Sequence, residues 1–363
     1  MEKRYYQNQM NKRGAIDISF NWIFVLIAGA AILTFFIAVI ATQKDKAETE
    51  MAITIKTELQ SIFSGASLSQ NRELDIDIPS SNLEFTCDFA TCTDFSTSTN
   101  PSCYSEFVIG KTGINTQLPA EIIFSPNHIS GKKILTWTKP WHIPFFVTNF
   151  LFISGADSHY LFIDSGHDST LTFFNEFPEK MNKDMISLES LETYNPKGSS
   201  TIKFIFVNFN PEEIIMPEQI LSATNPEKIN AINILPETKQ INFYYLSENS
   251  FTLSDTITFM TESEIYAAMF SDEVDSYKCN MQKAVNRFHI SSEVLNARAG
   301  QLYAYPSLTN CQIFYADYAN GLRTIIENTF VYSNQAINNL AVAVPTLESA
   351  NLAAQERSCP LIY

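Results

Sequence analysis

The chain has 363 residues, of which 45% are hydrophobic and 17% charged, and its formal net charge at pH 7 is −15. This length and composition allow one large folded domain or two small ones beside an anchor. Because a strongly acidic surface repels nucleic acid and anionic headgroups, the charge excludes nucleic acid as an expected partner.

An apolar run without a charged side chain extends from Ile18 to Ala41. At about 1.5 Å per residue, a helix of this length spans roughly 36 Å, enough to cross a bilayer with some tilt. The run is longer than the apolar region of a secretory signal, and no small-residue cleavage site follows it in the usual place. We therefore expect one membrane-spanning helix that stays on the chain.

The same helix is expected to continue beyond the bilayer, because apolar residues recur at steps of mostly four and three with charged residues between them. The pattern predicts one helix from about Ile16 to Phe63, roughly 70 Å long, which Gly65 then ends. The apolar positions are Ala47, Met51, Ile55, Leu59, Ile62 and Phe63.

A basic triplet, Lys12-Arg13-Gly14, stands directly before the apolar run that begins at Ala15. The short basic leader, this triplet and the long apolar helix resemble the class III signal peptide of archaeal type IV pilin-like and archaellin-like proteins. The resemblance implies that a membrane peptidase cuts between Gly14 and Ala15 and leaves the helix on the mature protein. It covers about fifty residues of the chain.

Residues 17–24 are also similar to the N-termini of membrane-anchored proteins from small-genome archaea whose activities are unknown. One position departs from the pilin pattern: many pilins carry a glutamate five residues after the cut, where this chain has Ser19. The acid nearest to the cut is Asp17, a residue type that the positive end of a helix favours.

Six cysteines fall into two groups of three and form no C-x-x-C pair. Their spacing matches no zinc motif, so disulfides are expected, with buried free thiols as the alternative. If all six pair, at least one bridge joins the groups; the sequence leaves the pairing open. The groups are Cys87, Cys92 and Cys103, then Cys279, Cys311 and Cys359.

Disulfides form outside the reducing cytosol, and four basic residues precede the span while three follow it. Both observations favour a cytoplasmic N-terminus and an extracytoplasmic main domain in the cell membrane. A domain that faces the cytosol with reduced cysteines is the alternative. The basic residues are Lys3, Arg4, Lys12 and Arg13, then Lys44, Lys46 and Lys56.

The rest of the chain predicts an α+β fold: a mixed β-sheet ectodomain with a C-terminal helical pair. Short apolar runs separated by weakly helical stretches indicate the mixed sheet, and Pro236–Lys239 suits a hairpin. The expected segments are a leader (1–14), the transmembrane helix with its amphipathic extension (15–64), a cysteine-containing β/loop region (65–133), the sheet domain (134–261) and the helical region (262–363).

Two long helices are predicted near the C-terminus. The first covers residues 271–302 and breaks near Ile290; the second covers 311–342 and is ended or kinked by Pro345. The aromatic-rich segment 137–152 is expected in the core, with a binding face as the alternative.

Two histidines and neighbouring carboxylates lie close together in the sequence and could ligate a divalent metal, because loops after strands often carry such groups. Ordinary turn chemistry is the competing interpretation. The candidate ligands are Asp157, His159, Asp164 and His167.

Common nucleophile, phosphate-binding and zinc-protease motifs do not occur in the sequence. We therefore expect a membrane-anchored envelope protein with a structural, adhesive or interaction role, no cofactor, and the lipid bilayer and other envelope or pilin-like proteins as partners. The alternative is a membrane-tethered enzyme or ligand-binding domain that uses the histidine region.

Overall fold

The computed structural model describes residues 13–93, 103–110, 113–196, 198–199, 201–328 and 331–363. The chain divides into two compact units, Met1–Thr54 and Ile55–Tyr363. The second unit contains two sheets and a group of C-terminal helices. The predicted mixed α/β architecture with a long N-terminal helix is therefore confirmed.

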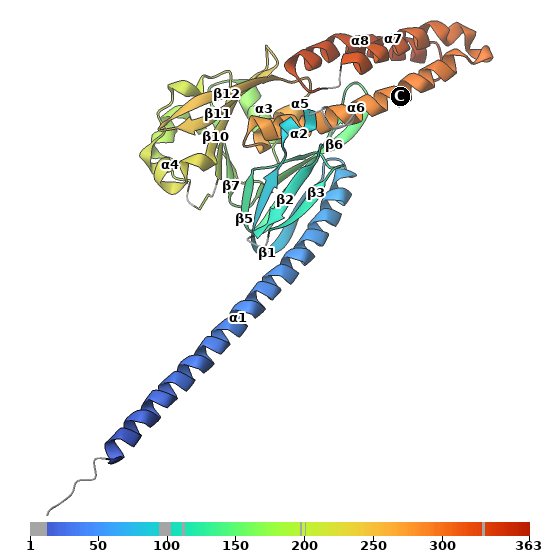
Figure 1. The fold of residues 1–363 in the computed structure, drawn as a ribbon. Coiled ribbons are helices and arrows are strands. Elements are labelled where there is room, and N and C mark those ends of the chain that lie inside the picture. Colours follow the sequence, from blue (N-terminus) through green and yellow to red (C-terminus); the bar gives the residue numbers. More distant parts are fainter. Residues whose placement is uncertain (1–12, 94–102, 111–112, 197, 200, 329–330) are drawn as a thin grey trace, which may run out of the picture. The chain divides into compact units, whose positions relative to one another are not determined.

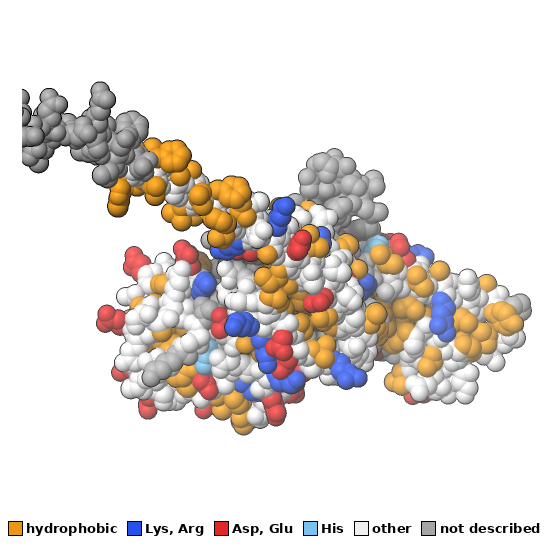
Figure 2. All heavy atoms as spheres, turned by 90° about the horizontal axis from the view of Figure 1, so that it is seen from below, with side chains coloured by type: hydrophobic (Ala, Val, Ile, Leu, Met, Phe, Trp, Pro, Cys, Tyr) orange, Lys and Arg blue, Asp and Glu red, His pale blue; other side chains and the backbone are white. Residues whose placement is uncertain are grey.

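Helix α1 (Arg13–Ser67) contains the apolar run. Its side chains from Trp22 to Ile40 form a band of exposed apolar groups (Figure 2). The hydroxyl of Thr34 donates to the Ala30 carbonyl at 2.7 Å, so this polar group is satisfied within the helix, as a lipid environment requires. Among the described residues, α1 is the helix long and apolar enough to cross a membrane.

The last turns of α1 belong to the second unit, where one face of the helix is buried. The predicted stripe starts too early, because Ala47 and Met51 are exposed. The predicted end is also early: α1 continues past Gly65 to Ser67, whose carbonyl accepts a hydrogen bond from the Asn149 side-chain amide at 2.9 Å. The buried positions are Ile55, Leu59, Phe63 and Ala66.

Sheet A has the strand order β3-β2-β1-β5-β6-β4. Its neighbours pair antiparallel, except that the short edge strand β4 runs parallel to β6. Strand β5 crosses the boundary expected at residues 133/134, so the two predicted segments share one sheet. The strands are β1 (Glu73–Thr86), β2 (Ser105–Ile109), β3 (Ile114–Leu118), β4 (Ile123–Phe124), β5 (His128–His142) and β6 (Phe146–Gly155).

Sheet B has the order β12-β11-β10-β9-β7-β8, with β8, β7, β9 and β10 parallel and the last two strands antiparallel. The predicted hairpin at Pro236–Lys239 is confirmed, because β10 and β11 pair directly on either side of it. The strands are β7 (Ser158–Asp164), β8 (Lys183–Ser187), β9 (Thr201–Val207), β10 (Ile229–Leu235), β11 (Gln240–Ser247) and β12 (Ser250–Thr258).

Helices α5 (Glu262–Phe270) and α6 (Val274–Tyr303) contact strands of both sheets or their shared core. Every residue of α5 after Glu262 is buried. The indole N–H of Trp141 donates to the Glu264 carboxylate at 2.9 Å, which satisfies a buried acid between β5 and α5. The core prediction for 137–152 is confirmed for Trp137, Trp141, Phe145, Phe150 and Phe152, and it is wrong for Phe146, which is 46% exposed.

Three shorter helices complete the described elements that precede the C-terminal group. Helix α2 (Phe89–Thr93) carries Cys92 and contacts α6. Helix α3 (Asp168–Glu176) and helix α4 (Glu218–Ala223) connect parallel strands of sheet B, β7 to β8 and β9 to β10.

The C-terminal helices differ from the prediction. Helix α6 is unbroken at Ile290, and the helix predicted for 311–342 is two helices, α7 (Gln312–Asn328) and α8 (Asn334–Glu356). The Ser333 hydroxyl accepts from the Ala336 N–H at 3.1 Å and starts α8 as an N-cap. Pro345 lies inside α8 rather than at its end. Figure 1 shows α7 and α8 side by side.

Gly321 explains why α7 and α8 can approach closely. A Cβ at this position would lie 2.8 Å from the Cδ2 of Leu347 on α8. Packing against the neighbouring helix therefore holds α8 through the proline, a tertiary effect that outweighs the local preference to stop.

Candidate functional site

The four residues predicted as metal ligands do not converge. His159 and Asp164 lie at opposite ends of β7, roughly 17 Å apart at about 3.3 Å per residue. Asp164 accepts from the Gly166 N–H at 2.9 Å in a turn, and His167 is an exposed residue at the start of α3. Among the described residues, the group close enough to hold a metal is Cys87, Cys92 and Cys279, which contains neither Asp157 nor the other three.

His159 is instead a buried residue at the centre of a hydrogen-bond network that reaches the surface at Asn182 and Asp184, which are both exposed. Its Nδ1 lies 3.2 Å from the Ser199 hydroxyl and 3.3 Å from the Asn182 amide nitrogen. Its Nε2 lies 2.9 Å from the Tyr194 hydroxyl and 3.1 Å from the Asp184 carboxylate. Because the Asn182 amide donates to Nδ1, the contacts fit a neutral ring that carries its proton on Nε2.

A serine hydroxyl that is hydrogen-bonded to an imidazole, which in turn is hydrogen-bonded to a carboxylate, is the arrangement that activates a serine nucleophile. Burial lowers the pKa of His159 although the Asp184 carboxylate opposes this shift, which keeps the ring neutral. Ser199 is buried, and the cavity of about 10 Å³ that His159 lines is bordered by none of the four partners and holds about one water molecule. We therefore interpret the network as one that fixes β7, β8 and the loop before β9.

All six cysteines are bridged, in the pairs Cys87–Cys279, Cys92–Cys103 and Cys311–Cys359. The expectation of disulfides is confirmed, and so is a bridge between the two groups. The last pair ties the start of α7 to the segment after α8.

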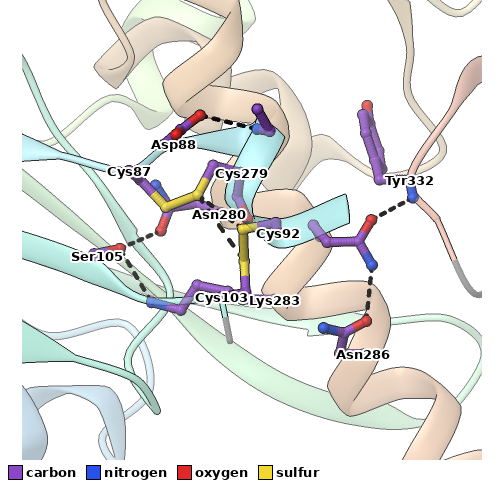
Figure 3. The surroundings of a disulfide bond; sticks show 12 residues. Cys87, Asp88, Cys92, Cys103, Ser105, Cys279, Asn280, Lys283, Asn286 and Tyr332 are labelled. Carbon is purple, nitrogen blue, oxygen red and sulfur yellow. Dashed lines mark hydrogen bonds between the residues drawn. A yellow bond between two sulfur atoms is a disulfide. The ribbon is translucent and has the colours of Figure 1, made fainter. Parts of the chain in front are cut away.

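Two of the bridges lie against each other (Figure 3). The Sγ of Cys92 is 3.3 Å from the Sγ of Cys279, and the Sγ of Cys103 is 4.0 Å from it. We call Cys87, Cys92, Cys103 and Cys279 the sulfur cluster. The sequence could not reveal it, because Cys279 lies 176 residues after Cys103.

A buried polar layer continues from the sulfur cluster along α6 (Figure 3). Asn280 accepts from the Ser105 hydroxyl at 2.8 Å and from the Ile123 N–H at 3.3 Å. The Lys283 ammonium donates to the Ser105 hydroxyl at 3.0 Å and the Leu118 carbonyl at 2.9 Å, and also to the Glu121 carbonyl. Burial lowers the pKa of Lys283 to about 7.

Lys283→Met is expected to lower the free energy of unfolding by about 2–3 kcal/mol, because it leaves buried carbonyls without a donor. The substitution should also weaken the dependence of the free energy of unfolding on pH. Between pH 7 and about 10 the unfolded chain binds a proton that folded Lys283 does not, so stability rises with pH in this window.

Denaturant titrations of the full chain in detergent at pH 7 and pH 9 test this. Burial also lowers the pKa of Lys203, to about 8, which makes stability rise with pH in the same way. The Lys283→Met variant should therefore still gain stability from pH 7 to pH 9, but less than the unsubstituted chain. Exposed Lys132→Met is the control and should behave like the unsubstituted chain. If the stability of Lys283→Met rises as much from pH 7 to pH 9 as that of the unsubstituted chain, the lowered pKa of Lys283 is contradicted.

Of the predicted processing residues, Lys12 lies outside the described residues, and Arg13, Gly14 and Ala15 form the first turn of α1. Cleavage after Gly14 therefore stays a prediction.

Comparisons with known proteins found no match: no family model fits the chain, and no curated protein or solved structure is significantly similar to it. The features that bear on function are therefore the apolar helix, the bridges and the surface of the second unit.

Proposed function

We propose that this protein is a single-pass membrane protein of the cell envelope, with its N-terminus in the cytoplasm and residues 55–363 outside, where they bind other envelope proteins. The observation that carries the proposal is α1: an exposed apolar run in a helix that continues without interruption to Ser67. An apolar surface of this length is stable in lipid and costly in water.

The bridges support the extracytoplasmic location. Three disulfides use all six cysteines of the chain. Such bridges persist in oxidising compartments and are rare in the cytosol.

The C-terminal helices support a role in binding proteins. A groove of about 570 Å³ between α7 and α8 is lined by Phe314, Asp317 and Pro345, among others. Large apolar side chains are also exposed on α6, α7 and α8, and exposed apolar surfaces are typical of protein contacts. They are Ile290 and Val294 on α6, Ile313 on α7, and Val342 and Leu352 on α8.

The location is tested by thiol labelling. The chain is taken from cells under acid quench, denatured with a chelator and treated with a maleimide before and after reduction. We expect no labelling before reduction and six labelled cysteines after it. Labelling of the unreduced chain would place the domain in the cytosol.

We further propose that a pilin-type peptidase removes residues 1–14, on the basis of the Lys12-Arg13-Gly14 triplet. Intact-mass measurement of the membrane protein should give an N-terminus at Ala15. Gly14→Leu should leave the leader attached, whereas Lys3→Ala, outside the triplet, should be processed. A mature chain that begins at Met1 would refute the processing and leave the anchor unaffected.

A further inference from the structure

We propose that the sulfur cluster is a zinc site when its cysteines are reduced, so that the same four residues hold either two disulfides or one Zn²⁺. This inference does not depend on the proposed function. It starts from the contact between two bridges that are distant in sequence, Cys87–Cys279 and Cys92–Cys103.

Two of the contacts between sulfurs already have about the spacing that zinc needs. With Zn–S bonds of about 2.3 Å, a tetrahedral four-thiolate site puts its sulfurs about 3.8 Å apart. The unbonded contacts from Cys279 to Cys92 and Cys103 measure 3.3 and 4.0 Å, and the sulfurs of Cys87, Cys92 and Cys279 all lie within 4.8 Å of one another. To hold zinc, the two S–S bonds have to open to the same spacing, and Cys103, which lies outside the group of three, has to approach Cys87.

The four cysteines come from different parts of the second unit. Cys87 follows β1, Cys92 lies on α2, Cys103 precedes β2, and Cys279 lies on α6. Three of them are buried and Cys103 is partly exposed. Most of the site is therefore shielded from solvent, and an ion reaches it from the side of Cys103. Structural zinc sites are closed in this way and join elements distant in sequence.

Groups around the cluster hold its backbone in place. The Sγ of Cys103 lies 3.5 Å from the Cys279 carbonyl. Asn280, next to Cys279, is fixed by Ser105 and by the backbone of Ile123. Such outer contacts orient metal ligands and limit the loss of entropy on binding.

The conversion balances with a dithiol as the reductant. Two dithiol molecules give four electrons and four protons to the two S–S bonds, which break to four thiols, and each dithiol closes to its own disulfide. Zn²⁺ then forms four Zn–S bonds and displaces the four thiol protons.

Zinc binding is tested on the full chain in detergent, after anaerobic reduction and removal of the reductant. Metal analysis after addition of Zn²⁺ should give about one ion per chain, and Co²⁺ in its place should give the absorption of a tetrahedral four-thiolate site. Zinc should protect four of the six cysteines from alkylation and leave Cys311 and Cys359 reactive.

Matched variants separate a site from general thiol binding. Cys103→Ser, at the partly exposed ligand, should lose the bound ion, whereas Cys103→His should retain it, because histidine replaces one cysteine in many zinc sites. Cys311→Ser/Cys359→Ser should bind zinc like the unsubstituted chain. Circular dichroism of each reduced variant reports whether it is folded.

The proposal is overturned if the reduced chain binds no zinc, whether it is folded or unfolded before the ion is added. It is also overturned if the Cys311/Cys359 variant loses the ion while Cys103→Ser keeps it. Neither result bears on the membrane anchor.

Discussion

Replacing both cysteines of the longest bridge, Cys87→Ser/Cys279→Ser, is expected to lower the free energy of unfolding by about 5 kcal/mol. The bridge joins residues 192 positions apart, and a cross-link that closes a longer loop removes more entropy from the unfolded chain. It also ties β1 of sheet A to α6, which packs in the shared core.

The other two bridges provide an internal scale. Cys311–Cys359 and Cys92–Cys103 close loops with separations of 48 and 11 residues, for which the same relation gives about 4 and about 3 kcal/mol. Double substitutions are needed, because a lone Cys279 thiolate would lie 3.3 Å from Cys92 and attack the neighbouring bridge. Denaturant titration of the oxidised full chain should reproduce this order, and a reversed order would contradict the pairing.

Phe63→Ala is expected to lower the free energy of unfolding by about 4 kcal/mol. Phe63 is fully buried at the end of α1, with ring centroids 6.3 Å from Phe85 on β1 and 5.9 Å from Phe107 on β2. Its removal takes away the buried area and the edge-to-face contact with Phe107, and it leaves a cavity beneath the helix.

Hydrogen exchange locates this effect. Amides of residues 55–67 should lose protection in Phe63→Ala before the strands of sheet B do. Leu68→Ala, one residue beyond the helix and 84% exposed, is the matched control and should change stability by less than about 0.5 kcal/mol. Equal behaviour of the two variants would show that the end of α1 is not packed on sheet A.

Features set by neighbouring residues could be predicted from the sequence. The uncharged run that is long enough to span a bilayer, the strand Ile229–Leu235 and its hairpin all depend on hydrophobic pattern and turn residues within a short window. Ser333 is a local signal for the start of α8, because serine before the first helical residue, Asn334, is a common N-cap.

The rest depends on contacts between distant residues. The sequence groups His159 with Asp157, Asp164 and His167, but its partners include Asp184 and Ser199. The parallel pairing of β7 with β8 and β9 brings these partners to it. The bridge Cys87–Cys279 joins residues 192 positions apart, so no pattern within a short window indicates this pairing.

Tertiary packing also overrode local rules. Pro345 predicts a helix that ends or kinks, and α8 does not end there but continues through the proline, where its Leu347 packs against Gly321 of α7.

Extraction of membranes with alkaline carbonate tests most directly the central claim that α1 remains on the chain as its anchor. We expect the full chain to stay in the membrane pellet. Leu26→Arg/Leu33→Arg should release it, because each arginine in the span opposes insertion by about 3 kcal/mol. Recovery of the unsubstituted protein in the supernatant, with an N-terminus beyond residue 41, would show that the helix is a cleaved signal and would contradict the account.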